Sequence, residues 1–124
     1  ITSVTQYMLS KGGNANPGLE LELRSGGFGA YLRTSGGYRV TPAGASATDG
    51  NWHLGVVTVD RGGNMVQYLD GVAKKTSDIS SYSAETIANT LSMYISTDRG
   101  GGSGFDGEVS GSAGGRAPRQ RQAA

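Results

Sequence analysis

Residues 49–71 read DGNWHLGVVTVDRGGNMVQYLDG, and this stretch decides the fold. Two runs of mainly apolar and β-branched residues, 52–59 and 65–69, flank the short segment DRGGN at 60–64. Glycine adopts positive φ without a Cβ clash and asparagine tolerates it, so this segment predicts a hairpin loop. Asp70-Gly71 predicts another tight turn after the second run. We expect these two strands to form the centre of a sheet, with the rest of the chain packed around them.

The strand with the clearest alternation lies upstream, at residues 18–24. Leucines at 19, 21 and 23 fall on one face, and the charged side chains at 20, 22 and 24 fall on the other. This period of two predicts one buried and one solvated face. Gly-Gly pairs at 26–27 and 36–37 lead into further strands at 28–33 and 38–41. The three strands together predict an antiparallel meander.

Further strands are expected at 5–10, 72–75, 91–96 and 105–109, and one helical turn is expected at 83–88 with Ser83 as its N-cap. Both faces of the run at 52–59 are largely apolar, which favours a strand in the middle of a sandwich. We therefore expect Trp52 and Leu19 in the core. The tyrosines that lie within apolar strands are also expected there: Tyr7, Tyr68 and Tyr94.

The composition indicates one domain with many strands and tight turns, because the 124 residues include 22 Gly, 3 Pro and no Cys. No disulfide can form, and the absence of cysteine is uninformative about compartment. No apolar run approaches the roughly 20 residues that a membrane-spanning helix needs. The chain begins at Ile1 without a visible signal peptide, and the missing initiator Met suggests trimming or a fragment.

Charge is distributed unevenly along the chain. The net charge of +1 includes three arginines after residue 115, and the remaining 8 Lys/Arg stand against 10 Asp/Glu. A mildly acidic folded part argues against a nucleic-acid partner. Residues 110–124, SGSAGGRAPRQRQAA, lack apolar periodicity and are expected to be a flexible basic tail. We accordingly expect a β-sandwich domain over 1–109, followed by this tail.

Four motifs occur in order along the chain: YMLSKGG at 7–13, DGNWH at 49–53, YLDG at 68–71 and FDGEV at 105–109. Together they resemble the laminin-G-like, pentraxin-like members of the concanavalin A-like jelly-roll superfamily. The resemblance implies an all-β fold, an antiparallel β-sandwich (jelly roll), and a lectin-like, non-catalytic role at an extracellular site or cell surface. The family's strands before residue 5 and after residue 109 are not matched. We therefore expect a sandwich that is incomplete at its edges, and a homodimer or a covering tail at those edges.

Candidate ligand-binding residues lie on the meander strands: Tyr31, Arg33, Tyr38 and Arg39. Tyrosine stacks on sugar rings and arginine donates paired hydrogen bonds, so this set suits a glycan or a protein surface. The alternative is that one tyrosine belongs to the core and the arginines face solvent. No cofactor is expected unless calcium binds, as it often does at the rim of the resembled domains. Its candidate oxygen ligands are Asn14, Asn16, Asp98 and Asp106.

Catalysis has two candidate centres, and we expect neither to be active. Glu20 and Glu22 lie about 6.5 Å apart along a strand, and paired carboxylates perform glycoside hydrolysis. Arg24 stands where the fuller glycosidase pattern continues with acids, so a solvated strand face with a Glu–Arg24 salt bridge is the preferred interpretation. His53 has no G-x-S-x-G nucleophile elbow to serve and is interpreted as a packed or hydrogen-bonded side chain. Glycan or protein recognition is thus preferred, a structural assembly module is the alternative, and a glycosidase is the weakest hypothesis.

Overall fold

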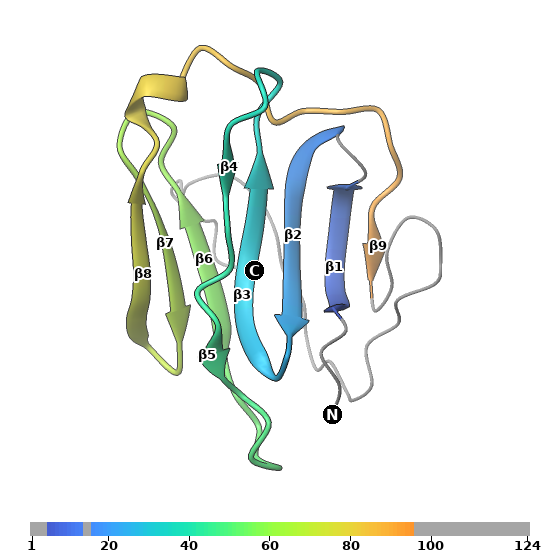
Figure 1. Cartoon of the computed structure of the whole chain (residues 1–124), viewed down its shortest axis with the longest axis vertical. Helices are drawn as coiled ribbons and strands as arrows, with labels where there is room; N and C mark the ends of the chain where they lie inside the picture. Colours follow the sequence, from blue (N-terminus) through green and yellow to red (C-terminus); the bar gives the residue numbers. More distant parts are fainter. Residues whose placement is uncertain (1–4, 14–15, 96–124) are drawn as a thin grey trace, which may run out of the picture.

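The structure is a computed structural model that describes residues 5–13 and 16–95 as two antiparallel β-sheets packed against each other (Figure 1). The six strands of the larger sheet are β1 (Thr5–Gly13), β2 (Asn16–Arg24), β3 (Gly27–Arg33), β4 (Arg39–Val40), β5 (Ala45–Ser46) and β9 (Tyr94–Ile95). Their order is β4-β3-β2-β1-β9, and β5 pairs with β3 beside β4. The smaller sheet has the order β6-β7-β8, from β6 (Gly55–Val59), β7 (Asn64–Leu69) and β8 (Val72–Asp78). The predicted all-β sandwich and the predicted meander of β2, β3 and β4 are confirmed.

The hairpin at the centre of the sequence forms as predicted between β6 and β7. The Asp60 N–H donates to Asn64 O at 3.0 Å, and the Gly63 N–H donates to Asp60 O at 3.0 Å. At the next turn, Asp70 has a φ of 53° and Gly71 a φ of 82°. Successive positive φ values suit the twist of a two-residue hairpin, which explains the Asp-Gly pair.

The first strand of this hairpin is shorter than predicted, and its position in the sheet differs. β6 begins at Gly55, and among the described strands it lies at the edge of its sheet and not in the middle. The expectation that Trp52 is in the core is wrong, because Trp52 is 66% exposed and Leu54 is 62% exposed. The reason is that contact with the Asp70 backbone ends at Leu54, whose O accepts the Asp70 N–H at 2.8 Å. Trp52 lies beyond that point, outside the paired strands.

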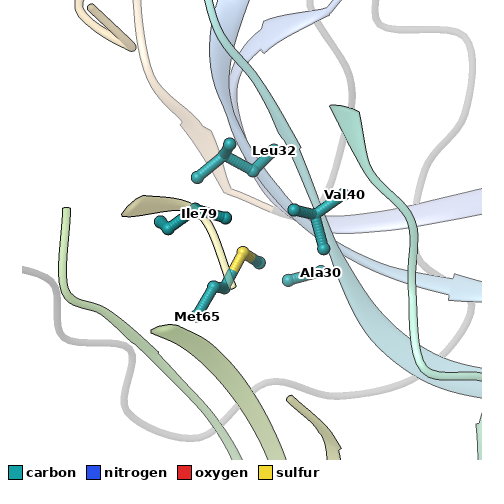
Figure 2. Packing of buried hydrophobic residues seen from close by; sticks show 5 residues of the cluster. All are labelled: Ala30, Leu32, Val40, Met65 and Ile79. Atoms are coloured by element: carbon teal, nitrogen blue, oxygen red, sulfur yellow. The ribbon is translucent and has the colours of Figure 1, made fainter. Parts of the chain in front are cut away.

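The core lies between the two sheets and has two clusters of buried side chains. Figure 2 shows the first cluster, in which side chains from both sheets meet: Ala30, Leu32, Val40, Met65 and Ile79. The second cluster contains Leu23, Phe28 and Leu69. Leu19 and Leu21 pack against the first cluster, so the leucine face of β2 is turned inward as predicted. The three tyrosines expected in the core are only half-buried: Tyr7, Tyr68 and Tyr94.

One buried polar side chain, Gln67 of β7, crosses from the smaller sheet to the larger one. Its Oε1 accepts the Ala30 N–H at 2.9 Å and the Ala43 N–H at 2.7 Å. Its Nε2 donates to Thr41 O at 3.0 Å. Residues 41–44 separate β4 from β5, so the side of β3 that faces away from β2 lacks a strand partner there. Gln67 therefore supplies the hydrogen bonds that a continuous strand would have made.

The segment that follows β8 differs most from the sequence prediction. Its helical turn is a 3₁₀-helix at Ser80–Tyr82, and Ser83 is its C-cap, so the predicted helix at 83–88 with Ser83 as N-cap is wrong. The strand predicted at 91–96 is reduced to the two residues of β9 within the described part. Three donor contacts from Lys11 Nζ, to Asn89 O, Asn89 Oδ1 and Leu91 O, hold this segment against β1. The strand predicted at 105–109 lies outside the described residues.

Candidate functional site

Three of the four predicted ligand-binding residues share one face of the larger sheet. Tyr31 of β3 is paired with Glu20 of β2, and Arg33 is paired with Arg39 of β4. Directly paired residues of antiparallel strands point to the same side, and side chains alternate along each strand. Tyr31, Arg33 and Arg39 thus lie on the face that is turned away from the smaller sheet, which we call the outer face. Tyr31 and Arg33 are half-buried, and Arg39 is exposed.

Tyr38 lies apart from these three residues. It packs against the core cluster of Ala30 and Leu32, on the opposite side of the sheet. Its ring stacks on that of Tyr82, with centroids 3.7 Å apart and planes inclined by 10°. Its backbone is fixed by Thr34, whose N–H donates to Tyr38 O at 2.9 Å. The structure accordingly agrees with the alternative interpretation in which one of the two tyrosines belongs to the core.

Glu20 and Glu22 are also on the outer face, but they are not solvated. Glu20 is 6% exposed and Glu22 is 0% exposed, so the prediction of a wet carboxylate face is wrong. Side chains on the neighbouring strands contribute to this burial, because β2 lies between β1 and β3 in the sheet. Ser10 and Tyr31 flank Glu20, and Ser10 Oγ donates to Glu20 Oε2 at 2.8 Å.

The surroundings of Glu22 disfavour its charged form. Burial is the largest effect and raises the pKa of Glu22 to about 7, the charge of Glu20 adds to it, and Arg24 opposes both. Arg24 Nη2 lies 2.9 Å from Glu22 Oε1, which confirms the predicted Glu–Arg24 salt bridge. The contact is an ion pair rather than an aligned hydrogen bond, because neither carboxylate oxygen accepts a hydrogen bond of good geometry from the described residues. The pKa of Glu22 therefore lies close to neutral pH.

His53 is hydrogen-bonded, as the sequence predicts, and it connects two acidic residues. Its Nδ1 lies 2.7 Å from Asp70 Oδ2, and its Nε2 lies 2.7 Å from Asp49 Oδ1. The sequence predicts only a turn at Asp70 and no pairing of Asp49 with His53. The signal was present in the two motifs DGNWH and YLDG, which each carry one of the acids.

Most of the candidate calcium ligands lie outside the described residues. Asn14, Asp98 and Asp106 are not among the described residues, and Asn16 is the first residue of β2. Within 5–13 and 16–95, no group of three or more His, Cys, Asp or Glu side chains is arranged to hold a metal ion. In the same part of the chain, no helix has the length and apolar character required to cross a bilayer.

A family model described as the concanavalin A-like lectin/glucanases superfamily matches residues 1–112, which is most of the chain. Neither the curated proteins nor the solved structures contain a significant match.

Proposed function

This chain belongs to the concanavalin A-like lectin/glucanases superfamily, and from that premise we propose that it is a non-catalytic module that binds glycan at its outer face. The superfamily supports a carbohydrate- or protein-binding module in general, and it also includes glycosidases. The choice of glycan and of the outer face rests on Tyr31, Arg33 and Arg39. Their position on a single face is the observation that carries the proposal.

The burial of the two glutamates supports a binding role over hydrolysis. A catalytic carboxylate must touch the glycosidic bond or the attacking water. Glu22 is 0% exposed and Glu20 is 6% exposed, so neither presents its carboxylate to a ligand in solution. Glu20 is also engaged by Ser10, and Glu22 by Arg24. In the proposed site, Glu20 and Glu22 are therefore buried neighbours of the ligand-binding residues and not an acid/base pair.

The residues of the proposed site have the chemistry that sugars require. A half-buried tyrosine ring offers an apolar face to the C–H side of a pyranose. The guanidinium groups of Arg33 and Arg39 donate several hydrogen bonds in a fixed geometry, which suits hydroxyl or carboxylate groups on a glycan. Two arginines on one face also favour an acidic sugar over a neutral one. Calcium remains an additional ligand in the proposal, through Asn14, Asn16, Asp98 and Asp106.

Replacing Tyr31 by Ala is expected to weaken glycan binding about fivefold, because an aromatic contact is worth about 1 kcal/mol. The measurement is a glycan array with and without calcium, followed by calorimetry with the best acidic and neutral hits. Lys74→Ala on β8 is the control, since Lys74 is exposed on the other sheet and its loss leaves the outer face unchanged. Equal affinities for Tyr31→Ala, Arg33→Ala and the unmodified chain would remove the outer face as the site.

A structural module that assembles through an open sheet edge is the second candidate function. One observation favours it: β6 has the sequence GVVTV, lies at an edge among the described strands, and carries no charge. Charged side chains normally protect edge strands from pairing with another chain. The opposite edge strand, β8, has that protection in Lys74, Lys75 and Asp78.

A lysine at position 56 is expected to abolish such assembly. Val56 is 38% exposed on β6, so Val56→Lys adds a charge at the edge without removing a core side chain. Multi-angle light scattering after size exclusion should give a mass above that of the monomer for the unmodified chain and the monomer mass for Val56→Lys. Thr76→Lys, on exposed β8, is the matched control and should behave like the unmodified chain. A monomeric unmodified chain at high concentration would exclude this second function.

A further inference from the structure

The loop before β6 is attached to the rest of the smaller sheet through the side chain of His53. Asp49, on the same loop, lies at Nε2 of the imidazole, and Asp70, in the turn between β7 and β8, lies at Nδ1, both at 2.7 Å. Asp70 is itself fixed, because its Oδ1 accepts the Leu54 N–H at 2.9 Å and its own N–H donates to Leu54 O at 2.8 Å. Asp49 has one other contact, from the Asn51 N–H at 2.9 Å.

The number of protons on the ring decides how many of these contacts can form. A carboxylate is only an acceptor, so each ring nitrogen that contacts one must carry a proton. Imidazolium has a proton on both nitrogens, and neutral imidazole has a proton on only one of them. The observed arrangement thus requires the charged ring. In the neutral ring, a nitrogen lone pair would face a carboxylate oxygen at 2.7 Å.

We propose that His53 is a proton-operated clasp: the charged ring holds Asp49 and Asp70 together, and the neutral ring keeps Asp70 and releases the Asp49 loop. Asp70 is the contact that persists because two backbone hydrogen bonds already position its carboxylate. Asp49 is exposed and lies in a loop without strand pairing, so it moves away at little cost. The released segment includes Trp52, which is 66% exposed.

The electrostatics of the three groups agree with the geometry. The hydrogen bonds that His53 makes to Asp70 and then to Asp49 raise the pKa of His53 above its usual value, against a smaller opposing effect of desolvation. The hydrogen bond from His53 lowers the pKa of Asp49 to about 2 and also lowers that of Asp70. These two acids are the charged groups that act on the ring, one from its own loop and one from the β7–β8 turn.

The pH range in which the clasp is closed follows from these directions. A raised pKa of His53 means that its contribution to stability is complete below about 6.5 and is lost as pH rises through the folded-state value. The lowered pKa values of Asp49 and Asp70 mean that their contribution is present above the usual aspartate pKa of 3.8 and is lost as pH falls through the folded-state values. The clasp is therefore closed in mild acid and opens as pH rises through the folded-state pKa of His53.

The chain offers a direct test, because it contains one His and one Trp and they are adjacent in sequence. Nuclear magnetic resonance of the imidazole gives the pKa of His53, and the emission of Trp52 over the same pH range reports on the loop. The clasp predicts a His53 pKa above 6.5 and a change in Trp52 emission with the same midpoint. In Asp49→Asn, the His53 pKa should fall and the change in Trp52 environment should shrink.

Asp78→Asn is the control for a surface charge change, because the carboxylate of Asp78 binds Ser80 and not His53. This variant should keep the midpoint of the unmodified chain. A His53 pKa at or below 6.5 would overturn the proposal, since it would mean that the two carboxylates do not stabilise the charged ring. The same conclusion would follow if Asp49→Asn left both the pKa and the emission curve unchanged.

Discussion

Gln67→Leu is expected to lower the free energy of unfolding by about 3 kcal/mol, although leucine has nearly the same size and is apolar. The substitution leaves the backbone N–H groups of Ala30 and Ala43 without the Gln67 oxygen that they share. An unsatisfied buried donor costs about 1–3 kcal/mol, and two such donors are exposed to this penalty at once. Urea denaturation followed by circular dichroism would measure the loss.

Lys75→Met is the matched control for this variant. Lys75 Nζ also donates to Thr41, at 3.0 Å to the backbone oxygen, but it does so from the exposed side of the same segment. Its removal should change stability by less than about 0.5 kcal/mol, as is usual for surface substitutions. If the two variants lost equal stability, the hydrogen bonds of Gln67 to Thr41 and Ala43 would not be what holds residues 41–44.

Glu22→Gln is expected to remove a pH dependence of stability that the unmodified chain shows between pH 5 and pH 8. Burial raises the pKa of Glu22 to about 7 in the folded chain, from the 4.5 that is usual for a glutamate in an unfolded chain. Because the folded pKa is raised, the penalty is absent below 4.5 and grows until pH passes 7. Between pH 5 and 8 the unmodified chain should lose about 2.5 kcal/mol through this group. The measurement is urea denaturation of both proteins at several pH values.

Arg24→Gln provides a second variant with the opposite expectation. The guanidinium of Arg24 lowers the pKa of Glu22, so its removal should raise that pKa further and steepen the loss of stability above neutral pH. The slopes of stability against pH are compared, and not the absolute stabilities. The reason is that Glu22→Gln also buries an amide that needs hydrogen-bond partners. Parallel curves for Glu22→Gln and the unmodified chain would show that Glu22 is charged at low cost.

Much of the fold could be predicted because it is encoded locally. The alternation at 18–24 assigns the leucines to the inner face of β2, and the DRGGN and Asp70-Gly71 segments predict the two turns that define β6, β7 and β8. The burial of Glu20 and Glu22 could not be predicted in the same way. Alternation tells which face a side chain is on, but burial depends on what packs beside and over that face, including side chains of β1 and β3.

The candidate site was predicted only in part for a related reason. Tyr31, Arg33 and Arg39 share a face because β3 and β4 pair in the expected order. Tyr38 leaves the group because its ring stacks on Tyr82, a residue in a 3₁₀-helix that no sequence pattern predicted. Trp52 is a large apolar residue of the kind expected in a core. It lies outside the core because the paired part of its strand begins only after it.

The pairing of β1 with β9 has a consequence for how the molecule assembles. β1, β2 and β3 join through short turns, as do β6, β7 and β8, so each group can nucleate early from neighbouring segments. The pairs Leu9–Ile95 and Ser10–Tyr94 instead join the two ends of the described chain. Closing so long a loop costs chain entropy, which two residue pairs and the contacts of Lys11 and Asn89 offset within the described residues. This seam should therefore form last during folding and be the first to separate under mechanical force.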